Sequence, residues 1–206
     1  MTGVVADLFS FLLALALLAP LAAQSEGFVP PVDEQAHLSP RWRVALLPNQ
    51  KKPATRFSGV KVDGRAAVLI DADSSYGNLV LDLPGQPVPR RIHWSWRIEQ
   101  PNPAADLHEK AGDDTAARVC LSFDLPLERV PFVERQVLRV ARSAAGESLP
   151  AATLCWVWGV REAPGSVIDS PFSRRLRYLV LRNQADGVGQ WHEEHRDVMA
   201  DFRRVF

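Results

Sequence analysis

The sequence lacks a surplus of charge of either sign. Across 206 residues, Lys and Arg together number 24, and so do Asp and Glu. A protein that attracts nucleic acid or anionic lipid through its overall field needs a basic excess. The balance therefore excludes a nucleic-acid partner of that kind and favours a neutral ligand that is bound locally.

Cysteine is scarce, since the chain contains Cys120 and Cys155 alone. Two widely spaced cysteines exclude a disulfide framework and a zinc-finger pattern. Both lie in apolar runs that predict strands. They could pair in an oxidising compartment if these strands are neighbours. The other interpretation, which we favour at this point, is two small buried hydrophobic side chains.

The chain also lacks an apolar run long enough to cross a membrane. The uncharged run 8–18 is too short for a stable span, and it is followed by Ala22 and Ala23 and then by polar residues. This pattern predicts a signal peptide over residues 1–23, a linker over 24–39 and a periplasmic or secreted protein. The alternative is an N-terminal helix buried in the fold.

Apolar residues occur in short runs between turn residues, and the chain contains six Trp, nine Phe and 16 Pro. The pair Asp63-Gly64 separates the extended runs 57–62 and 66–72, which is a strong signal for a β-hairpin. Strict alternation over 92–98 predicts another strand with one apolar face. Five other short runs also predict strands: 41–47, 79–83, 118–125, 154–158 and 176–180.

One segment follows a helical period instead. Val133, Val137 and Val140 recur at helical spacing after Pro131, a residue that is favoured in the first turn of a helix. The sequence therefore predicts one mostly β domain over residues 40–206. It is expected to be an antiparallel, jelly-roll-like β-sandwich with one amphipathic helix around residues 131–143.

Two adjacent carboxylates, Asp113 and Asp114, lie in a Gly-containing turn before Arg118. Such a pair could bind Ca²⁺ or accept hydrogen bonds from sugar hydroxyls. The alternative, which we favour, is that the two carboxylates cap a turn and form an ion pair with Arg118.

A second polar cluster, residues 191–197, contains His192, Glu193 and His195. It resembles a metal site in composition, but its spacing is not that of a zinc-protease helix. A solvent-facing helix with a salt-bridge network around Arg196 and Asp197 is the interpretation we favour.

Tryptophan falls into two groups. Four lie on predicted apolar strand faces and are expected in the core: Trp94, Trp96, Trp156 and Trp158. Trp42 and Trp191 lie near the ends of predicted elements, where exposed rings could stack on a sugar.

Six segments share their order and spacing with a known pattern: 94–97, 110–118, 154–158, 170–172, 191–197 and 201–202. Together they resemble a bacterial family, the domain of unknown function 3047. The resemblance covers about residues 38–206 and implies an exported bacterial protein without an assigned catalytic residue. Members of that family continue past the equivalent of Phe206 with a further strand, so we expect either a truncated gene or an open sheet edge here.

These observations predict a non-catalytic module that binds a cell-envelope saccharide, with Ca²⁺ as a possible ion. One alternative is an envelope hydrolase that uses Asp113 or Asp114 with Glu193 or His192. Another is a structural protein that binds an envelope protein by strand addition. The predicted ligand-binding residues are Asp113, Asp114, Arg118, Trp191, Arg196 and Asp197.

Overall fold

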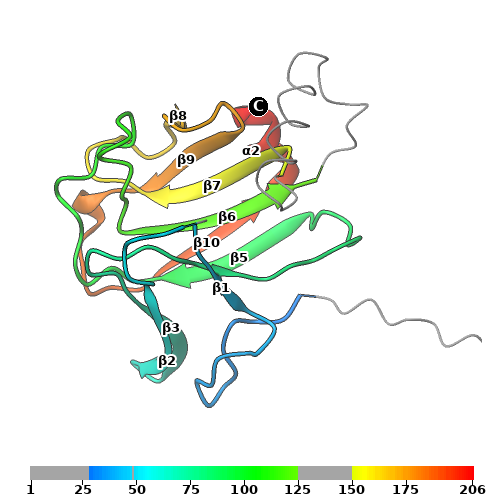
Figure 1. Cartoon of the computed structure of the whole chain (residues 1–206), viewed down its shortest axis with the longest axis vertical. Coiled ribbons are helices and arrows are strands. Elements are labelled where there is room, and N and C mark those ends of the chain that lie inside the picture. The colour runs from blue at the N-terminus through cyan, green and yellow to red at the C-terminus, as the bar shows by residue number, and fades with distance from the viewer. Residues whose placement is uncertain (1–27, 48, 125–149) are drawn as a thin grey trace, which may run out of the picture. The chain divides into compact units, whose positions relative to one another are not determined.

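A computed structural model of the chain describes residues 28–47, 49–124 and 150–206. The predicted signal peptide at 1–23 and the predicted helix at 131–143 lie outside the described residues. The chain divides into two compact units, residues 1–86 and residues 87–206. The fold is mostly β, which confirms the predicted fold class (Figure 1). The described sheets are antiparallel except for one parallel pair of strands in the four-stranded sheet, which the sequence did not predict.

The first unit contains two separate two-stranded antiparallel sheets. The predicted hairpin is present, and its turn residues Asp63 and Gly64 both have positive φ, 51° and 77°. Asn, Asp and Gly tolerate this conformation best, so the sequence of the turn fixes the hairpin register. The pairs are β1 with β4 and β2 with β3: β1 (Arg43–Ala45), β4 (Asn78–Val80), β2 (Arg56–Val62) and β3 (Arg65–Asp71).

The described part of the predicted linker is bound to the first unit. Val32 and Leu38 form a β-bridge, and the Trp42 indole donates a hydrogen bond to the Val29 carbonyl at 2.9 Å. A Cβ atom at Gly59 would lie 1.7 Å from the Ala36 carbonyl oxygen. Glycine at this position of β2 therefore allows the preceding chain to approach the strand.

The second unit contains a two-stranded sheet and a four-stranded sheet. The two-stranded sheet pairs β5 (Arg91–Trp96) with β10 (His192–Asp197) in antiparallel fashion. The four-stranded sheet has the order β6-β7-β9-β8, and its central pair, β7 and β9, is parallel. Its strands are β6 (Ala117–Phe123), β7 (Ala152–Trp158), β9 (Leu176–Arg182) and β8 (Val167–Asp169).

Alternation along β7 gives the four-stranded sheet two apolar faces. Leu154 and Trp156 lie on the inner face, toward β5, whereas Cys155 and Val157 lie on the outer face. Ring contacts join the two sheets, since Trp94 lies 5.5 Å from Trp156 between ring centroids. The second unit is therefore a two-layer β structure with a tryptophan-rich core, as the alternation predicted.

The loop before β6 covers part of the outer face. Leu107 is buried there against Val157, Ile168 and Val180. Since both faces of β7 are covered, residues 154–158 form a continuous buried run.

The expected helix over residues 192–197 is wrong, because these residues form β10. His192, Glu194 and Arg196 are at least partly buried, and the residues between them are exposed, so the pattern has a period of two. The helix begins one residue later as α2 (Val198–Val205), with the Asp197 side chain accepting a hydrogen bond from the Ala200 amide at 2.9 Å. In the described ranges, no helix has the length and apolar character needed to cross a membrane.

Candidate functional site

Asp201 of α2 is a buried carboxylate with three donors. Arg196 donates two hydrogen bonds to it, at 2.8 and 2.6 Å, and the Trp156 indole donates a third at 2.8 Å. This contact raises the pKa of Arg196 above its usual value. The salt-bridge network predicted around Arg196 is therefore present, and it fastens α2 to β7 and β10.

Glu194 repeats this arrangement on the neighbouring part of β10. Its buried carboxylate accepts hydrogen bonds from the Arg182 guanidinium at 2.8 Å and from the Trp96 indole at 3.2 Å. Each buried carboxylate thus has one arginine and one tryptophan as partners. The arginines neutralise the carboxylates of β10 and α2, and the tryptophan indoles donate further hydrogen bonds to them.

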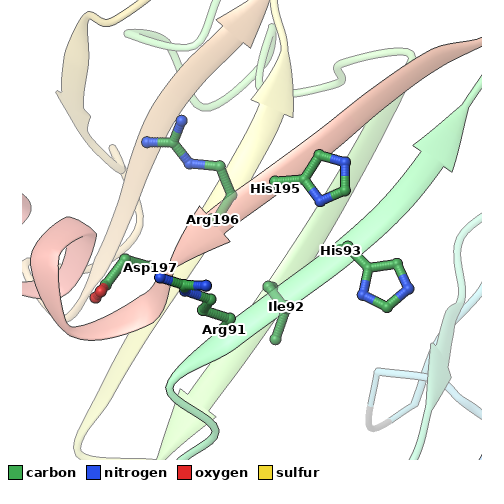
Figure 2. A pocket seen from close by; sticks show the side chains of 6 residues that line it. All are labelled: Arg91, Ile92, His93, His195, Arg196 and Asp197. Atoms are coloured by element: carbon green, nitrogen blue, oxygen red, sulfur yellow. The ribbon is translucent and has the colours of Figure 1, made fainter.

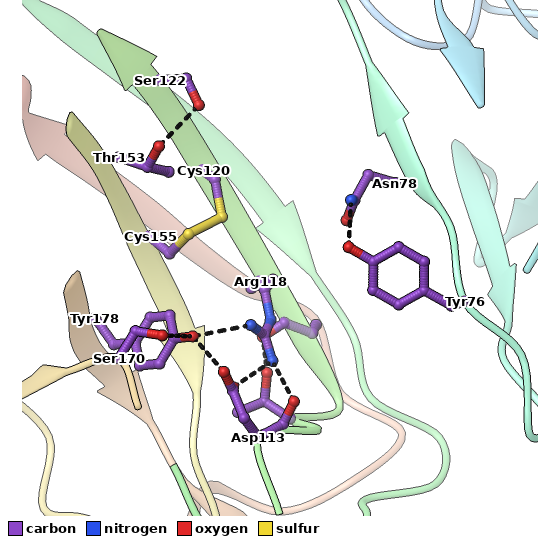
Figure 3. The surroundings of a disulfide bond; sticks show 12 residues. Tyr76, Asn78, Asp113, Arg118, Cys120, Ser122, Thr153, Cys155, Ser170 and Tyr178 are labelled. Carbon is purple, nitrogen blue, oxygen red and sulfur yellow. Dashed lines mark hydrogen bonds and ion pairs between the residues drawn. A yellow bond between two sulfur atoms is a disulfide. The ribbon is translucent and has the colours of Figure 1, made fainter. Parts of the chain in front are cut away.

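Asp113 lies on the outer face, where it contacts β9 and β6 (Figure 3). Its side chain is 3% exposed, and it forms an ion pair with Arg118 at 3.0 Å. The Tyr178 hydroxyl donates a hydrogen bond to the carboxylate at 2.5 Å and lies 3.1 Å from the Ser170 hydroxyl. Burial, together with the bond to Asp113, raises the pKa of Tyr178 to about 12. The ion-pair interpretation of Asp113 is thus confirmed.

Asp114 is separate from this cluster. It is exposed, and its carboxylate accepts a hydrogen bond from the Asn102 amide at 3.2 Å. The two neighbouring aspartates therefore have different partners.

The hydrolase alternative requires the Asp113 turn and the His192 segment to meet. Asp113 is bonded to Tyr178 on the outer face, whereas His192 packs against Trp158 on the inner face, with ring centroids 5.2 Å apart. Glu193 is exposed on β10, on the side away from the buried Glu194. The sheet separates the two clusters, so the structure does not assemble that pair of carboxylates.

Cys120 and Cys155 form a disulfide across β6 and β7 (Figure 3). The interpretation favoured from the sequence, that the two cysteines are unpaired buried side chains, is therefore wrong. The two residues are directly opposite in the strand register, and their Cα atoms lie 4.1 Å apart. Alternation had placed each cysteine on its own strand, but it could not give the register between the strands.

A polar hollow of about 530 Å³ lies beside β5 and β10 (Figure 2). His93 and His195 lie side by side on the two strands, and Arg91 lies opposite Asp197. Arg196 also lines the hollow. Besides Ile92, the wall thus combines two imidazoles, the Arg91 guanidinium and one carboxylate, and these polar groups are planar and form directional hydrogen bonds. The Arg196 guanidinium is directed inward to Asp201.

Asp197 is the carboxylate of the hollow. The Ala200 amide lowers the pKa of Asp197 below its usual value, and the nearby Arg90 and Arg203 lower it further. Asp197 is therefore an anion at neutral pH, on a wall that also carries the Arg91 guanidinium.

The structure brings together part of the predicted set. Arg196 and Asp197 line the hollow, Asp113 and Arg118 form the outer-face ion pair, and Asp114 belongs to neither. Trp191 is partly buried, as is Trp42, so neither ring is a fully exposed platform.

His93 and Arg91 were not predicted from the sequence as site residues. Both precede their partners on β10 by about 100 residues, and only the pairing of β5 with β10 brings them to the hollow. The alternation over residues 92–98 does place His93 on the polar face, which was the available signal.

The proposed cluster of His192, Glu193, Glu194 and His195 does not converge. The strand directs His192 and Glu194 inward and the other two outward. Within the described residues, no group of three or more His, Cys, Asp and Glu side chains is arranged to hold a metal ion.

The fold and the hollow define a two-layer β protein with a polar surface on its smaller sheet. The chain belongs to the family described as protein of unknown function DUF3047, which matches residues 40–206. The family resemblance found in the sequence is thereby confirmed. No curated protein and no solved structure matches the chain.

Proposed function

We propose that this protein is an exported, non-catalytic binding protein of the cell envelope, and that its ligand is a saccharide held in the hollow beside β5 and β10. The observation that carries the proposal is the composition of the hollow wall. Arg91, His93, His195 and Asp197 present planar donors and acceptors around one concave surface. Sugar hydroxyls act as both donors and acceptors, so they match a wall of this kind.

The charge of the wall favours an uncharged or weakly charged saccharide. Arg196 is already paired with Asp201, and Asp197 lies opposite Arg91 in the strand register. The remaining groups therefore supply hydrogen bonds instead of a strong field of one sign.

Export is supported by the Cys120–Cys155 disulfide. Disulfides persist in the periplasm and outside the cell, whereas thiol systems keep most cytosolic cysteines reduced. The predicted signal peptide at residues 1–23 points the same way.

A non-catalytic role is supported by the state of the buried carboxylates. Asp113, Glu194 and Asp201 each form an ion pair with an arginine. These partners hold the three carboxylates within the fold, whereas a general acid must reach the reacting group of a bound ligand.

The test is a calorimetric screen of residues 24–206 against a panel of cell-wall saccharides, with EDTA present. Asp197→Asn should weaken saccharide binding about tenfold or more, because a hydrogen bond to the charged carboxylate is replaced by a weaker one to a neutral amide. Asn is as good a helix N-cap as Asp, so the change leaves the start of α2 intact. Asp169→Asn, an exposed position on β8, serves as the matched control.

Two outcomes would contradict the proposal. One is the absence of binding to every saccharide at millimolar concentration. The other is normal binding by Asp197→Asn together with loss of binding by Asp114→Asn, which would move the site to the turn before β6.

A further inference from the structure

His93 and His195 form a cross-strand pair of imidazoles. They are directly opposite in the antiparallel register of β5 and β10, and both are exposed. Their ring centroids lie 6.0 Å apart, with 18° between the ring planes (Figure 2). Two strands fix the backbone of both residues, so the pair is held in place before any ligand arrives.

Neither imidazole forms a hydrogen bond within the part of the chain that the structure describes. Each neutral ring therefore keeps one nitrogen lone pair available to an external group. Imidazole nitrogen is a preferred ligand of Zn²⁺ and Cu²⁺. Two imidazole rings side by side can therefore supply one lone pair each to a shared cation.

We propose that His93 and His195 together bind one divalent transition-metal ion, Zn²⁺ or Cu²⁺. In a tetrahedral site with metal–nitrogen distances of about 2.0–2.1 Å, two ring centroids lie roughly 5 Å apart. The observed spacing of 6.0 Å is close to this value, and rotation of exposed side chains closes the difference. The β5–β10 backbone does not have to move.

Carboxylates flank the pair on the same face of the sheet. Glu193 and Asp197 are each two residues from His195 on β10, so they extend to the same side of the strand. Arg91 lies opposite Asp197 and lowers the attraction of this end for a cation. The proposed site thus has two protein ligands, His93 and His195, and water completes the coordination of the metal ion.

The metal site shares His93 and His195 with the proposed saccharide surface, but it does not require a bound saccharide. It excludes the other histidine of β10. His192 lies inward against Trp158, where it does not face the hollow. Replacement of His93 or His195 therefore tests the proposed site without disturbing the tryptophan core.

The experiment uses the mature chain without a histidine tag, stripped of metal. Titration with Zn²⁺ by calorimetry should give one ion per chain, and Cu²⁺ should bind more tightly, as the general order of metal affinities requires. The electron paramagnetic resonance spectrum of the Cu²⁺ form should show coupling to nitrogen. Ca²⁺, which prefers oxygen ligands, should not bind at this site.

His93→Ala and His195→Ala should each weaken Zn²⁺ binding about tenfold or more, because each removes one of two protein nitrogens. His108→Ala removes an exposed histidine from the loop before β6 and should leave binding unchanged. Circular dichroism confirms that each variant is folded.

Zn²⁺ binding that is absent below millimolar concentration would overturn the proposal. So would equal affinity of the wild type and the double variant H93A/H195A. Because the saccharide screen contains EDTA, its result does not depend on this metal, and failure of either proposal can be recognised separately.

Discussion

At the scale of single residues, the buried charge of Asp201 depends on Arg196. We predict that Asp201→Ala lowers the free energy of unfolding by about 3–5 kcal/mol, because it leaves the Arg196 guanidinium and the Trp156 indole without their acceptor. Chemical denaturation measures this change.

Asp169→Ala is the control for Asp201→Ala. Asp169 forms an exposed ion pair with Arg177, so its replacement should cost no more than about 1 kcal/mol. Similar losses in the two variants would show that Asp201 does not hold α2 on the sheet.

Tyr178 makes the stability of the fold sensitive to alkaline pH. Its pKa is raised to about 12 in the folded protein, whereas an unfolded tyrosine ionises near pH 10. Between these values the unfolded chain releases a proton that the folded protein retains. Stability is therefore fully present below about pH 10 and declines as the pH rises toward 12.

Replacing Tyr178 tests this linkage. Urea unfolding from pH 8 to 12 should show a shallower decline for Tyr178→Phe than for the wild type. The variant should also be less stable at pH 7, by about 1–3 kcal/mol, since Asp113 loses a donor. Tyr76→Phe changes the other tyrosine and should keep the wild-type slope. Parallel curves for the wild type and Tyr178→Phe would contradict the argument.

At the scale of elements, the disulfide joins β6 to β7 across a sequence separation of 35 residues. Closing a loop of this length restricts the unfolded chain and stabilises the fold by about 4 kcal/mol in the chain-entropy relation. We predict that Cys120→Ala/Cys155→Ala lowers the melting temperature. A reductant should lower the melting temperature of the wild type toward the same value and leave the double variant unchanged. A wild type that does not respond to the reductant would contradict this prediction.

Local chemistry made several elements predictable. The hairpin of β2 and β3 follows from Asp63-Gly64, and the two faces of β7 follow from alternation. β8 escaped prediction because its apolar run is only Val167 and Ile168, whereas the three-residue strands β1 and β4 lie in longer runs. β10 escaped because its inward side chains are polar, and a pattern based on apolar residues does not reveal a strand whose inner face is His192, Glu194 and Arg196.

The candidate site was less predictable than the fold, for a related reason. Arg118 and Asp113 are five residues apart, so their ion pair was visible in the sequence. Tyr178 joins them from 65 residues away, and Trp156 reaches Asp201 across 45 residues. Contacts of this kind depend on strand order and register, and period-two alternation determines neither.

At the scale of the whole molecule, the hydrophobic core is unevenly distributed. The described core clusters lie between residues 92 and 205, which belong to the second unit. Among the described residues of the first unit, Thr55 is buried, whereas Leu69 and Ile70 of β3 are about half exposed. Two-stranded sheets of this kind gain little from apolar burial and are marginal by themselves.

We therefore predict a gradient of protection against hydrogen exchange along the chain. Amides of β7 and β9 should exchange only through global unfolding, because both strands are buried and paired on both edges. Amides of β2 and β3 should exchange on the order of a hundredfold faster, through local opening of their hairpin. Exchange measured by mass spectrometry resolves these peptides. Equal protection of β2–β3 and β7–β9 would contradict this gradient. It would mean that residues 40–206 unfold as one cooperative domain, as predicted from the sequence. The hairpin would then gain its stability from contacts beyond its own two strands.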